Sequence, residues 1–339
     1  MEQDLLVNDF LKQSEEGIIV DVRTPAEYQL GHITGAVNIP LFSDEERVII
    51  GTLYKKQGKE IAVEKGLEFV GPKMASFVKE AKKLSQGKPI FIYCWRGGMR
   101  SGSMAWLFRT AGLNVKRLTG GYKAYRSSFL EDILNRPWQI RVLGGPTGCG
   151  KTDILHQLSA KGEQVLDIEG LANHKGSAFG ALGQDDQPTT EQFVNLLHHE
   201  FRKFSTERII WCEGESISIG RVYIPKELFD MMQKAPFIYL NLPVETRLNR
   251  LVNEYGQFSM EELTESFRRI ERRLGGQHLK AALCYLQEGN IHEAARIGLH
   301  YYDKSYDRAI NEKRNVACHL DVDTDNPTET ANLLLKLKF

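Results

Sequence analysis

The sequence predicts an α/β protein with two domains, each built on a parallel sheet. Short apolar segments alternate with amphipathic, helix-like segments in the first third of the chain, and a second cycle of this alternation begins near residue 138. Such alternation is typical of a parallel sheet covered by helices. A chain of 339 residues is long enough for two domains. We expect them at residues 1–128 and 138–339, joined by a linker at 129–137.

The individual elements follow from runs of β-branched and aromatic residues and from the helical spacing of apolar ones. In the first domain we expect strands at 17–22, 89–93 and 115–118 and helices at 74–84 and 101–111. In the second domain we expect strands at 139–143, 165–168, 208–212, 237–242 and 316–320, a helix at 151–160, and a helical tail at about 258–312.

The composition excludes several classes of protein. The 44 Lys and Arg residues balance 44 Asp and Glu residues, and zero net charge excludes a strongly basic nucleic-acid coat. No apolar run approaches the roughly 20 residues of a membrane span, and the amino terminus lacks the basic-then-apolar order of a secretory signal. The five cysteines are scattered without a CxxC pair, which argues against a disulfide framework or a zinc cluster. We therefore expect a soluble, cytoplasmic protein without a membrane partner.

Cys94 ends an apolar strand and opens a glycine-rich turn, Cys-Trp-Arg-Gly-Gly-Met-Arg, ahead of a helix. The amides of such a turn, the helix N-terminus and the arginines together attract anions. The same positive field is expected to favour the thiolate form of Cys94. We take Cys94, Arg96 and Arg100 as candidate catalytic residues.

Two chemistries use a loop of this kind. In sulfurtransferases the thiolate carries a sulfur atom as a persulfide, whereas in cysteine phosphatases it attacks a phosphate monoester. Five residues separate Cys94 from Arg100, which is the phosphatase spacing, and simpler sulfurtransferases commonly have four. The larger loop suits a tetrahedral oxyanion, and the spacing alone leaves both chemistries open.

Segments around the loop resemble the rhodanese family. They are Asp21-Val22-Arg23-Thr24-Pro25, the stretch from Gly31-His32-Ile33 to Ile39-Pro40, and Leu118-Thr119-Gly120-Gly121-Tyr122. The resemblance covers about residues 1–126 and implies a rhodanese-like fold with Cys94 as the chalcogen carrier. We expect Asp21 and Arg23 to form a structural ion pair that braces the sheet, and a structural role for His32.

A second motif, from Gly145 to Thr152, fits the pattern GxxxxGK[ST] after an expected strand and before an expected helix. The candidate phosphate-binding residues are Gly145, Gly148, Gly150, Lys151 and Thr152. Glycines let main-chain amides surround a phosphate, the lysine neutralises it, and the threonine hydroxyl is of the kind that holds Mg²⁺. Amides recognise a polyphosphate whether it carries adenosine or a prenyl chain, so the ligand stays open.

No Walker B aspartate follows this loop. Glu213 and Glu215 follow the expected strand at 208–212, and Asp167 and Glu169 lie at the end of the preceding strand. Each of these four carboxylates is a candidate for metal binding or acid–base chemistry. A surface or helix-cap position explains each of them equally well.

A rhodanese-like domain ahead of a phosphate-loop domain is an uncommon pairing, and it resembles the bacterial tRNA 2-selenouridine synthase family. Further segments carry the resemblance over nearly the whole chain: Glu46-Arg47 with 51–55, 167–180, 213–216, Leu274-Gly275-Gly276-Gln277 and Tyr301-Tyr302-Asp303. Ile217 and Ser218 depart from it, because the family tends to have basic residues there.

The resemblance implies a tRNA-modifying transferase that replaces the sulfur of wobble 2-thiouridine by selenium. It implies S-geranylation of that sulfur with geranyl diphosphate, followed by selenation with selenophosphate. The phosphate loop would then hold geranyl diphosphate, and Cys94 would serve the chalcogen step. A selenophosphate-supplying enzyme is the implied protein partner.

Contacts with the anticodon region of tRNA are expected from basic and aromatic side chains. Arg268, Arg269, Arg272 and Arg273 would form two basic stripes on one helix, with Phe267, Ile270 and Leu274 on its packed face. Further candidates are Arg247, Arg250 and Trp95. A solvated helix face explains each arginine as well as RNA contact does, and a core position explains Trp95 better.

Two hypotheses from other classes stay open on the sequence. A two-domain cysteine phosphatase and P-loop kinase, acting on a small phosphorylated molecule, would use the same two loops. A regulatory binding module would need only the rhodanese-like fold, but such copies usually lose the cysteine that this chain retains.

Overall fold

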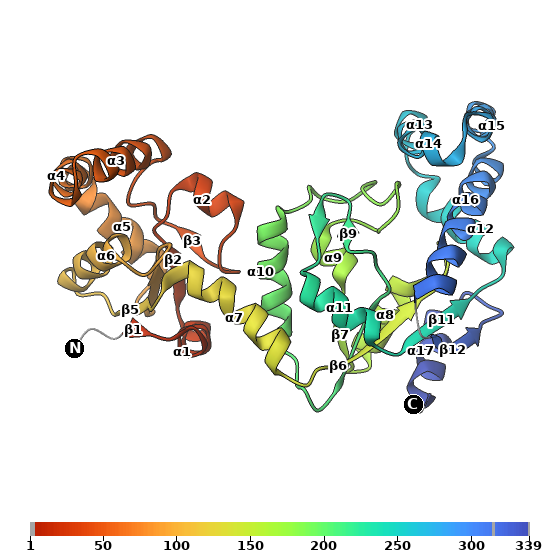
Figure 1. Cartoon of the computed structure of the whole chain (residues 1–339), viewed down its shortest axis with the longest axis horizontal. Helices are drawn as coiled ribbons and strands as arrows, with labels where there is room; N and C mark the ends of the chain where they lie inside the picture. The colour runs from red at the N-terminus through yellow and green to blue at the C-terminus, as the bar shows by residue number, and fades with distance from the viewer. Residues whose placement is uncertain (1–3, 314–315, 338–339) are drawn as a thin grey trace. The chain divides into compact units, whose positions relative to one another are not determined.

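The structure, a computed structural model, describes residues 4–313 and 316–337. The chain divides into two compact units, residues 1–135 and 136–339 (Figure 1). The outermost residues of the two predicted domains, 1–3 and 338–339, lie outside the described residues. Within the described ranges, no helix is long and apolar enough to cross a membrane.

The first unit contains a five-stranded sheet in which every pairing is parallel. The strand order is β1 (Asp4–Leu5), β5 (Val115–Leu118), β4 (Ile90–Tyr93), β2 (Ile18–Asp21) and β3 (Val37–Asn38). The three predicted strands are confirmed as β2, β4 and β5. Strands β1 and β3 were not predicted, because two residues are too few to show a period.

Helices cover both faces of this sheet. They are α1 (Val7–Gln13), α2 (Pro25–Leu30), α3 (Asp44–Lys56), α4 (Lys59–Val70), α5 (Met74–Ser85), α6 (Met99–Thr110) and α7 (Gly121–Asn135). Alternate residues of β4 enter opposite cores, as the period of a strand requires. Ile90 and Ile92 pack in one core with residues of α5 and α6. Phe91 and Tyr93 pack in the other with residues of α1 and α7.

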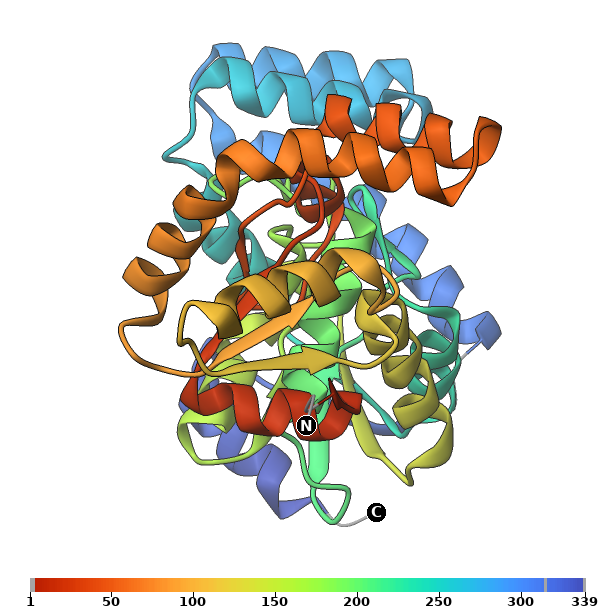
Figure 2. The same ribbon diagram turned by 90° about the vertical axis from the view of Figure 1, so that its left-hand side faces the viewer.

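Helices α3 and α4 lie side by side as a hairpin (Figure 2). Helix α3 begins with a capping box, in which the Ser43 side chain accepts from the Glu46 amide and the Glu46 carboxylate accepts from the Ser43 amide. Lys73 pairs with Glu46 at 2.6 Å. The sequence analysis did not predict these helices, because exposed apolar residues such as Val48 and Leu67 obscure the amphipathic pattern.

Helix α7 occupies most of the segment expected to be a linker. It continues to Asn135 and so includes residues 129–135. Phe129 and Ile133, one helical turn apart, are buried on its inner face. Only Arg136, Pro137 and Trp138 lie between α7 and the first strand of the second unit. Residues 129–135 are therefore helical and lie within the first unit.

The second unit contains another five-stranded, wholly parallel sheet. The strand order is β12 (Val316–Asp321), β11 (Phe237–Asn241), β6 (Gln139–Gly144), β8 (Ile209–Glu213) and β7 (Gln164–Leu166). All five predicted strands are confirmed, although β7 ends at Leu166, because Asp167 caps the next helix. A short antiparallel pair, β9 (Ser218–Ile219) and β10 (Val222–Tyr223), follows β8.

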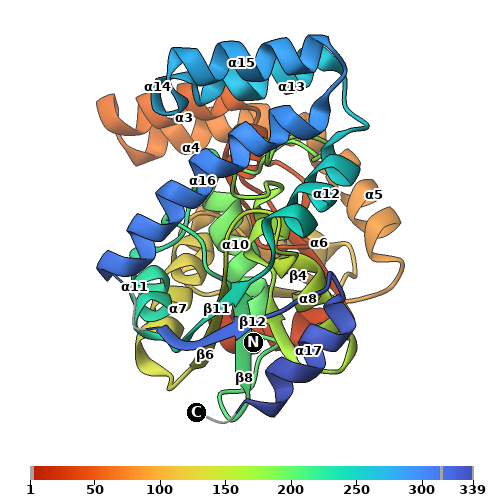
Figure 3. The ribbon, with the colours of Figure 1, turned by 90° about the vertical axis from the view of Figure 1, so that its right-hand side faces the viewer.

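The helices of the second unit are α8 (Lys151–Ala160), α9 (Ile168–Ala172), α10 (Thr190–Phe201), α11 (Lys226–Lys234), α12 (Val244–Tyr255), α13 (Met260–Arg269), α14 (Glu271–Leu274), α15 (Gly276–Gln287), α16 (Ile291–Lys313) and α17 (Pro327–Lys336). Helices α8 and α17 pack together against the sheet in one core. Helices α13 to α16 form a separate helical region with a core of its own (Figure 3). The predicted helical tail is thereby confirmed.

The prediction that four arginines share one helix is wrong. Helix α13 ends at Arg269, and Ile270, with φ −102° and ψ 4°, separates it from α14. Ile270 is buried together with Phe267 and Leu274, which confirms the predicted packed face. The chain turns at Ile270 because all three side chains enter the core that α15 and α16 complete.

The predicted Asp21–Arg23 ion pair is confirmed and fully buried, at 0% and 1% exposure. Two guanidinium nitrogens of Arg23 donate to Asp21, with Nη2 at 2.7 Å from Oδ2, and Nη2 also donates to the carbonyl of Gly31 at 2.6 Å. The guanidinium lies 3.8 Å from the centre of the Tyr122 ring. The pair therefore ties the end of β2 to α2 and α7.

Replacing Arg23 by Met should destabilise the first unit by about 3–5 kcal/mol, because it leaves the Asp21 carboxylate buried without its partner. Equilibrium urea unfolding, followed by tryptophan fluorescence, measures this loss. The matched control is Arg117→Met, which breaks a more exposed pair with Asp4 and should lose about 1 kcal/mol or less. Equal losses in the two variants would contradict a bracing role for Arg23.

Candidate functional site

Cys94 lies at the carboxyl end of β4, directly before the loop that leads into α6. Its side chain is buried at 3% exposure, and its Sγ lies 3.2 Å from the hydroxyl oxygen of Ser101. The N-cap of α6 is Gly98, a residue without a side chain to cap the first-turn amides. These amides and the positive end of the helix dipole are therefore the local groups that attract an anion. Ser101 was not among the predicted site residues.

Gly121 closes the cysteine loop from the far side. A Cβ atom on Gly121 would lie 2.3 Å from the Cys94 carbonyl oxygen and 2.4 Å from the Gly97 amide nitrogen, and its φ is +63°. Only glycine fits such an approach. The amide of Tyr122 then donates to the Cys94 carbonyl at 2.9 Å. The resemblance between Leu118–Tyr122 and a rhodanese turn is thus explained by contact between α7 and the cysteine loop.

Arg100 is paired with a carboxylate from α2. Its two terminal nitrogens lie 2.5 and 3.2 Å from the Glu27 carboxylate oxygens. Burial raises the pKa of Glu27, but hydrogen bonds and charge from Arg100 outweigh burial and hold the pKa below its ordinary value. Arg100 therefore carries its charge at the start of α6 within an ion pair, while Arg96 is exposed on the loop.

Trp95 and His32 both have packing partners. Trp95 is half-buried, and its ring centre lies 5.7 Å from that of Tyr122, in the aromatic core of the first unit. His32 stacks on Tyr28 at 3.9 Å, and its Nδ1 lies 2.9 Å from the Tyr28 carbonyl oxygen. Burial lowers the pKa of His32. These contacts agree with structural roles.

The phosphate loop connects β6 to α8, in the strand–loop–helix order that the motif requires. Gly145, Gly148 and Gly150 all have positive φ. Gly150, at φ +74°, is the N-cap of α8, so this helix also begins without a side-chain cap. Lys151 Nζ donates to the Gly145 carbonyl at 3.2 Å, across the mouth of the loop.

Thr152 and two of the four predicted carboxylates meet beside this loop. The Thr152 hydroxyl donates to Glu169 Oε2 at 3.2 Å, and Glu169 also hydrogen-bonds with Glu215. Burial, and then the charge of Glu215, raises the pKa of Glu169 to about 8. Two carboxyl groups that hydrogen-bond to each other share a proton, so the pair carries less than two negative charges at neutral pH.

The other two carboxylates, Glu213 and Asp167, are not among the residues that line the cleft over this loop. Glu213 is fully buried at the end of β8, and its Oε2 accepts from the Ile168 amide at 3.1 Å. Burial first, and then the charges of Asp167 and Glu169, raise the pKa of Glu213 well above its ordinary value. Asp167 accepts from the Gly170 amide at 2.7 Å and so caps α9. Both residues therefore have structural contacts of their own.

A cleft of about 1280 Å³ opens over the phosphate loop. Its walls include Lys151 and Thr152 of the loop, Glu169, Glu215, and the segment 175–177. The sequence analysis did not single out Lys175, which pairs with Glu254 at the edge of the cleft. A lysine followed by glycine and serine is too common in protein sequences to be identified as part of a site.

Arg247 has a structural position. It is 4% exposed, donates to Asp303 through both terminal nitrogens at 2.8 Å, and donates to the Thr147 carbonyl at 3.2 Å. A guanidinium so enclosed braces the phosphate loop, and it is not placed to contact an RNA backbone. Arg250 lines the cleft and pairs with Asp153 and Asp325.

The four arginines at the α13–α14 junction are exposed. They are Arg268, Arg269, Arg272 and Arg273. Arg269 pairs with Glu265 one helical turn before it, at 2.9 Å. The junction thus places a cluster of positive charge on the surface of the helical region.

Comparisons with known proteins match both units. A family model for the rhodanese-like domain matches residues 6–128, and one for the tRNA 2-selenouridine synthase AAA domain matches residues 138–329. A tRNA 2-selenouridine synthase of Shewanella frigidimarina is 35% identical over 331 residues, covering 95% of this chain and 86% of the relative. One of Hydrogenovibrio crunogenus is 32% identical, covering 89% of this chain and 91% of the relative.

Among solved structures, the N-terminal domain of a putative ATP/GTP binding protein from Clostridium difficile is 44% identical to this chain. It covers 38% of this chain and 99% of its own, with a TM-score of 0.37.

The raised pKa of Glu169 makes stability depend on pH. The folded protein keeps a proton that the unfolded chain, with a carboxyl pKa of 4.5, releases, so the free energy of unfolding should fall as pH rises from 4.5 to about 8. Glu169→Gln should make this fall shallower, as measured by thermal unfolding across that range. The exposed Glu207→Gln should leave the pH dependence unchanged. Identical pH profiles for wild type and Glu169→Gln would contradict the shared proton.

Proposed function

The chain belongs to the tRNA 2-selenouridine synthase family, and from that membership we propose that it is a selenotransferase acting on tRNA. The observation that carries the proposal is the match to relatives of this name over nearly the whole chain. Both anion-binding loops are intact, with Cys94 at one and Lys151 at the other. Family membership favours this proposal over the phosphatase–kinase and binding-module hypotheses.

The proposed reaction has two steps. First, the sulfur of the wobble 2-thiouridine attacks the allylic carbon of geranyl diphosphate, and the carbon–oxygen bond breaks with release of diphosphate. Second, selenium from selenophosphate takes the place of the S-geranyl group. Geranylthiol leaves, and water takes up the phosphoryl group as phosphate. Alkylation makes the sulfur a better leaving group than the thiocarbonyl that preceded it.

We assign the first step to the phosphate loop. Amides that surround a diphosphate stabilise the charge that develops on it as the carbon–oxygen bond breaks. Lys151 lies at the mouth of this loop, held by the Gly145 carbonyl at 3.2 Å, so its ammonium group is placed to move onto a bound phosphate. The loop also fixes the orientation of the geranyl chain, so that its allylic carbon faces the sulfur of the thiouridine.

Mg²⁺ suits this position. Thr152 and the Glu169–Glu215 pair offer oxygen ligands next to the loop, and oxygen is the ligand that Mg²⁺ prefers. In the described part of the chain, no group of three or more His, Cys, Asp or Glu side chains is arranged to hold a metal. Thr152 and Glu169 would hold the ion together with phosphate oxygens and water. When bound, Mg²⁺ would neutralise the diphosphate.

We assign the second step to the cysteine loop. Selenophosphate is a tetrahedral anion, and the N-terminus of α6 with Arg96 and Arg100 offers positive charge around Cys94. Cys94 lies at the start of this loop, and we assign it to the selenation step. A selenophosphate-supplying enzyme is the expected partner for delivery of this anion.

We assign contact with the tRNA backbone to the arginines at the α13–α14 junction, which are exposed. Phosphate contacts of this kind position RNA without reading its sequence. Arg247 is left out of this assignment because it is buried.

The decisive experiment incubates the protein with 2-thiouridine-containing tRNA, geranyl diphosphate and selenophosphate, and analyses the digested RNA by mass spectrometry. The expected products are an S-geranyl nucleoside without selenophosphate and a 2-selenouridine with it. An unchanged nucleoside under both conditions would contradict the proposed function.

Cys94→Ser should lower selenium incorporation by at least about 100-fold, because a hydroxyl cannot replace a thiolate as the reacting group. S-geranylation, which does not use the cysteine loop, should stay within about twofold of wild type. The control is Cys284→Ser, which changes an exposed cysteine. Equal loss of both products in Cys94→Ser would contradict the division of labour between the two loops.

Lys151→Ala should lower S-geranylation by about 100-fold, because it removes a charge that stabilises the departing diphosphate. Selenation of a tRNA that is already S-geranylated should be retained, as the same mass analysis would show. Lys161→Ala, at the exposed end of α8, is the matched control. Retained geranylation in Lys151→Ala would remove the phosphate loop from this step.

A further inference from the structure

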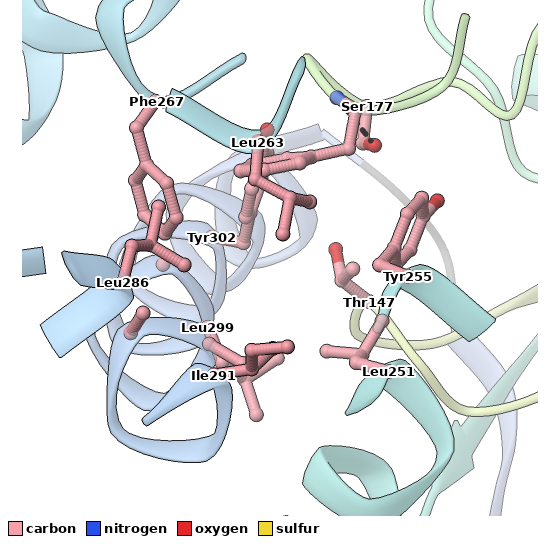
Figure 4. Close-up of a pocket in the computed structure, with 14 residues that line it drawn as sticks. Thr147, Ser177, Leu251, Tyr255, Leu263, Phe267, Leu286, Ile291, Leu299 and Tyr302 are labelled. Atoms are coloured by element: carbon pink, nitrogen blue, oxygen red, sulfur yellow. Dashed lines mark hydrogen bonds between the residues drawn. The ribbon is translucent and has the colours of Figure 1, made fainter. Parts of the chain in front are cut away.

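An apolar pocket lies next to the phosphate loop, between α12 and the helical region (Figure 4). It has a volume of about 50 Å³ and is lined mainly by aliphatic and aromatic side chains. Thr147, Ser177 and Tyr255 lie on one side of it, and Phe267 and Leu286 lie on the other (Figure 4). The pocket thus has a polar rim on the side of the phosphate loop and a hydrocarbon wall opposite.

The pocket adjoins the cleft over the phosphate loop. The two share five lining residues: Thr147, Ser177, Leu251, Tyr255 and Tyr302. Thr147 belongs to the phosphate loop itself, two residues after its first glycine, Gly145. A ligand with its phosphate groups in the loop therefore reaches the pocket past Thr147 and Leu251.

Helix α16, which forms one wall of the pocket, is tied to the phosphate loop. Arg247 donates to Asp303 of α16 at 2.8 Å and to the Thr147 carbonyl at 3.2 Å. Tyr302, next to Asp303, accepts from the Ala178 amide at 2.9 Å through its hydroxyl oxygen. These bonds hold the hydrocarbon wall at a set position relative to the phosphate groups. Within the motif Tyr301-Tyr302-Asp303, Tyr302 and Asp303 are the residues that make these contacts.

The chemistry of the two neighbouring sites selects an amphiphilic ligand. The phosphate loop binds anionic oxygens, while carbon surfaces in the pocket would leave the ring nitrogens of a nucleotide base without partners. A hydrocarbon chain needs no such partners, and each methylene group that it buries strengthens binding about fourfold. The pocket volume of about 50 Å³ suits the last carbons of a hydrocarbon chain whose first carbons lie in the cleft.

We propose that this pocket receives the hydrocarbon end of the prenyl diphosphate, and that Gly298 of α16 determines how long a chain it accepts. The assignment rests on the proposed function of the phosphate loop. Gly298 is buried, and a Cβ atom there would meet Phe267 Cε1 at 3.4 Å, an ordinary contact. A larger side chain at this position would therefore occupy the space beside Phe267 that the chain needs.

The test measures binding of inorganic pyrophosphate and of dimethylallyl, geranyl and farnesyl diphosphates to the full chain by calorimetry. Wild type should bind geranyl diphosphate at least about tenfold more tightly than pyrophosphate. Gly298→Leu should lose about tenfold in affinity for geranyl diphosphate, while pyrophosphate and the five-carbon dimethylallyl compound stay within about twofold. His300→Leu adds the same side chain at an exposed position of α16 and should bind as wild type.

A second variant that narrows the pocket tests whether the effect of Gly298→Leu comes from misfolding. Ala295→Leu, from the same wall, should show the same selective loss, and unchanged thermal unfolding would show that both variants are folded. Equal binding of pyrophosphate and geranyl diphosphate by wild type would overturn the assignment. So would a Gly298→Leu variant that weakens all four ligands alike. A third outcome separates the two proposals. If Gly298→Leu weakens geranyl diphosphate selectively but the protein transfers no prenyl group to thiolated tRNA, the pocket assignment is supported and the proposed function is contradicted.

Discussion

Both candidate sites depend on a helix N-terminus that no side chain caps, placed where a buried parallel strand ends. Gly98 and Gly150 occupy the N-cap positions of α6 and α8. In other helices the N-cap side chain does accept these amides, as Ser43 does in α3 and Ser259 in α13, although α4 and α15 also begin with a glycine. Glycine at the cap leaves first-turn amides and the dipole for a ligand. All-parallel sheets make the arrangement possible, because each buried strand leads directly into a loop and a helix.

The carboxyl groups near the two candidate sites are neutralised in different ways. In the first unit, Arg23 neutralises Asp21 by direct pairing, and Arg100 neutralises Glu27. In the second unit, carboxyl groups gather at the ends of β7 and β8, and protons compensate for much of their charge, as the raised pKa values of Glu169 and Glu213 indicate. The phosphate loop therefore lies beside carboxyl groups that would release a proton on binding a cation. This suits a ligand that arrives with both negative charge and a metal ion.

The helical region of the second unit is anchored to the phosphate loop. It has its own hydrophobic core, with Phe267, Ile270 and Leu274 among its members. One buried guanidinium, that of Arg247, links this region to the phosphate loop through Asp303 and Thr147. A buried ion pair of this kind contributes positional order more than net stability. The phosphate loop and the apolar pocket thereby lie next to each other, although their residues come from elements far apart in the sequence.

The sequence by itself predicts two α/β units and the placement of Cys94 and Lys151 in loops between a strand and a helix, because these three parts are contiguous in the chain. It did not show that α7 runs through the expected linker, nor that the chain breaks at Ile270, because burial by distant helices decides both. Only the tertiary structure brought Arg100 to Glu27, 73 residues away, and joined Glu169 to Glu215. Hydrogen bonds and desolvation act through space, so residue type and spacing alone do not reveal which charges meet or which of them stay neutral.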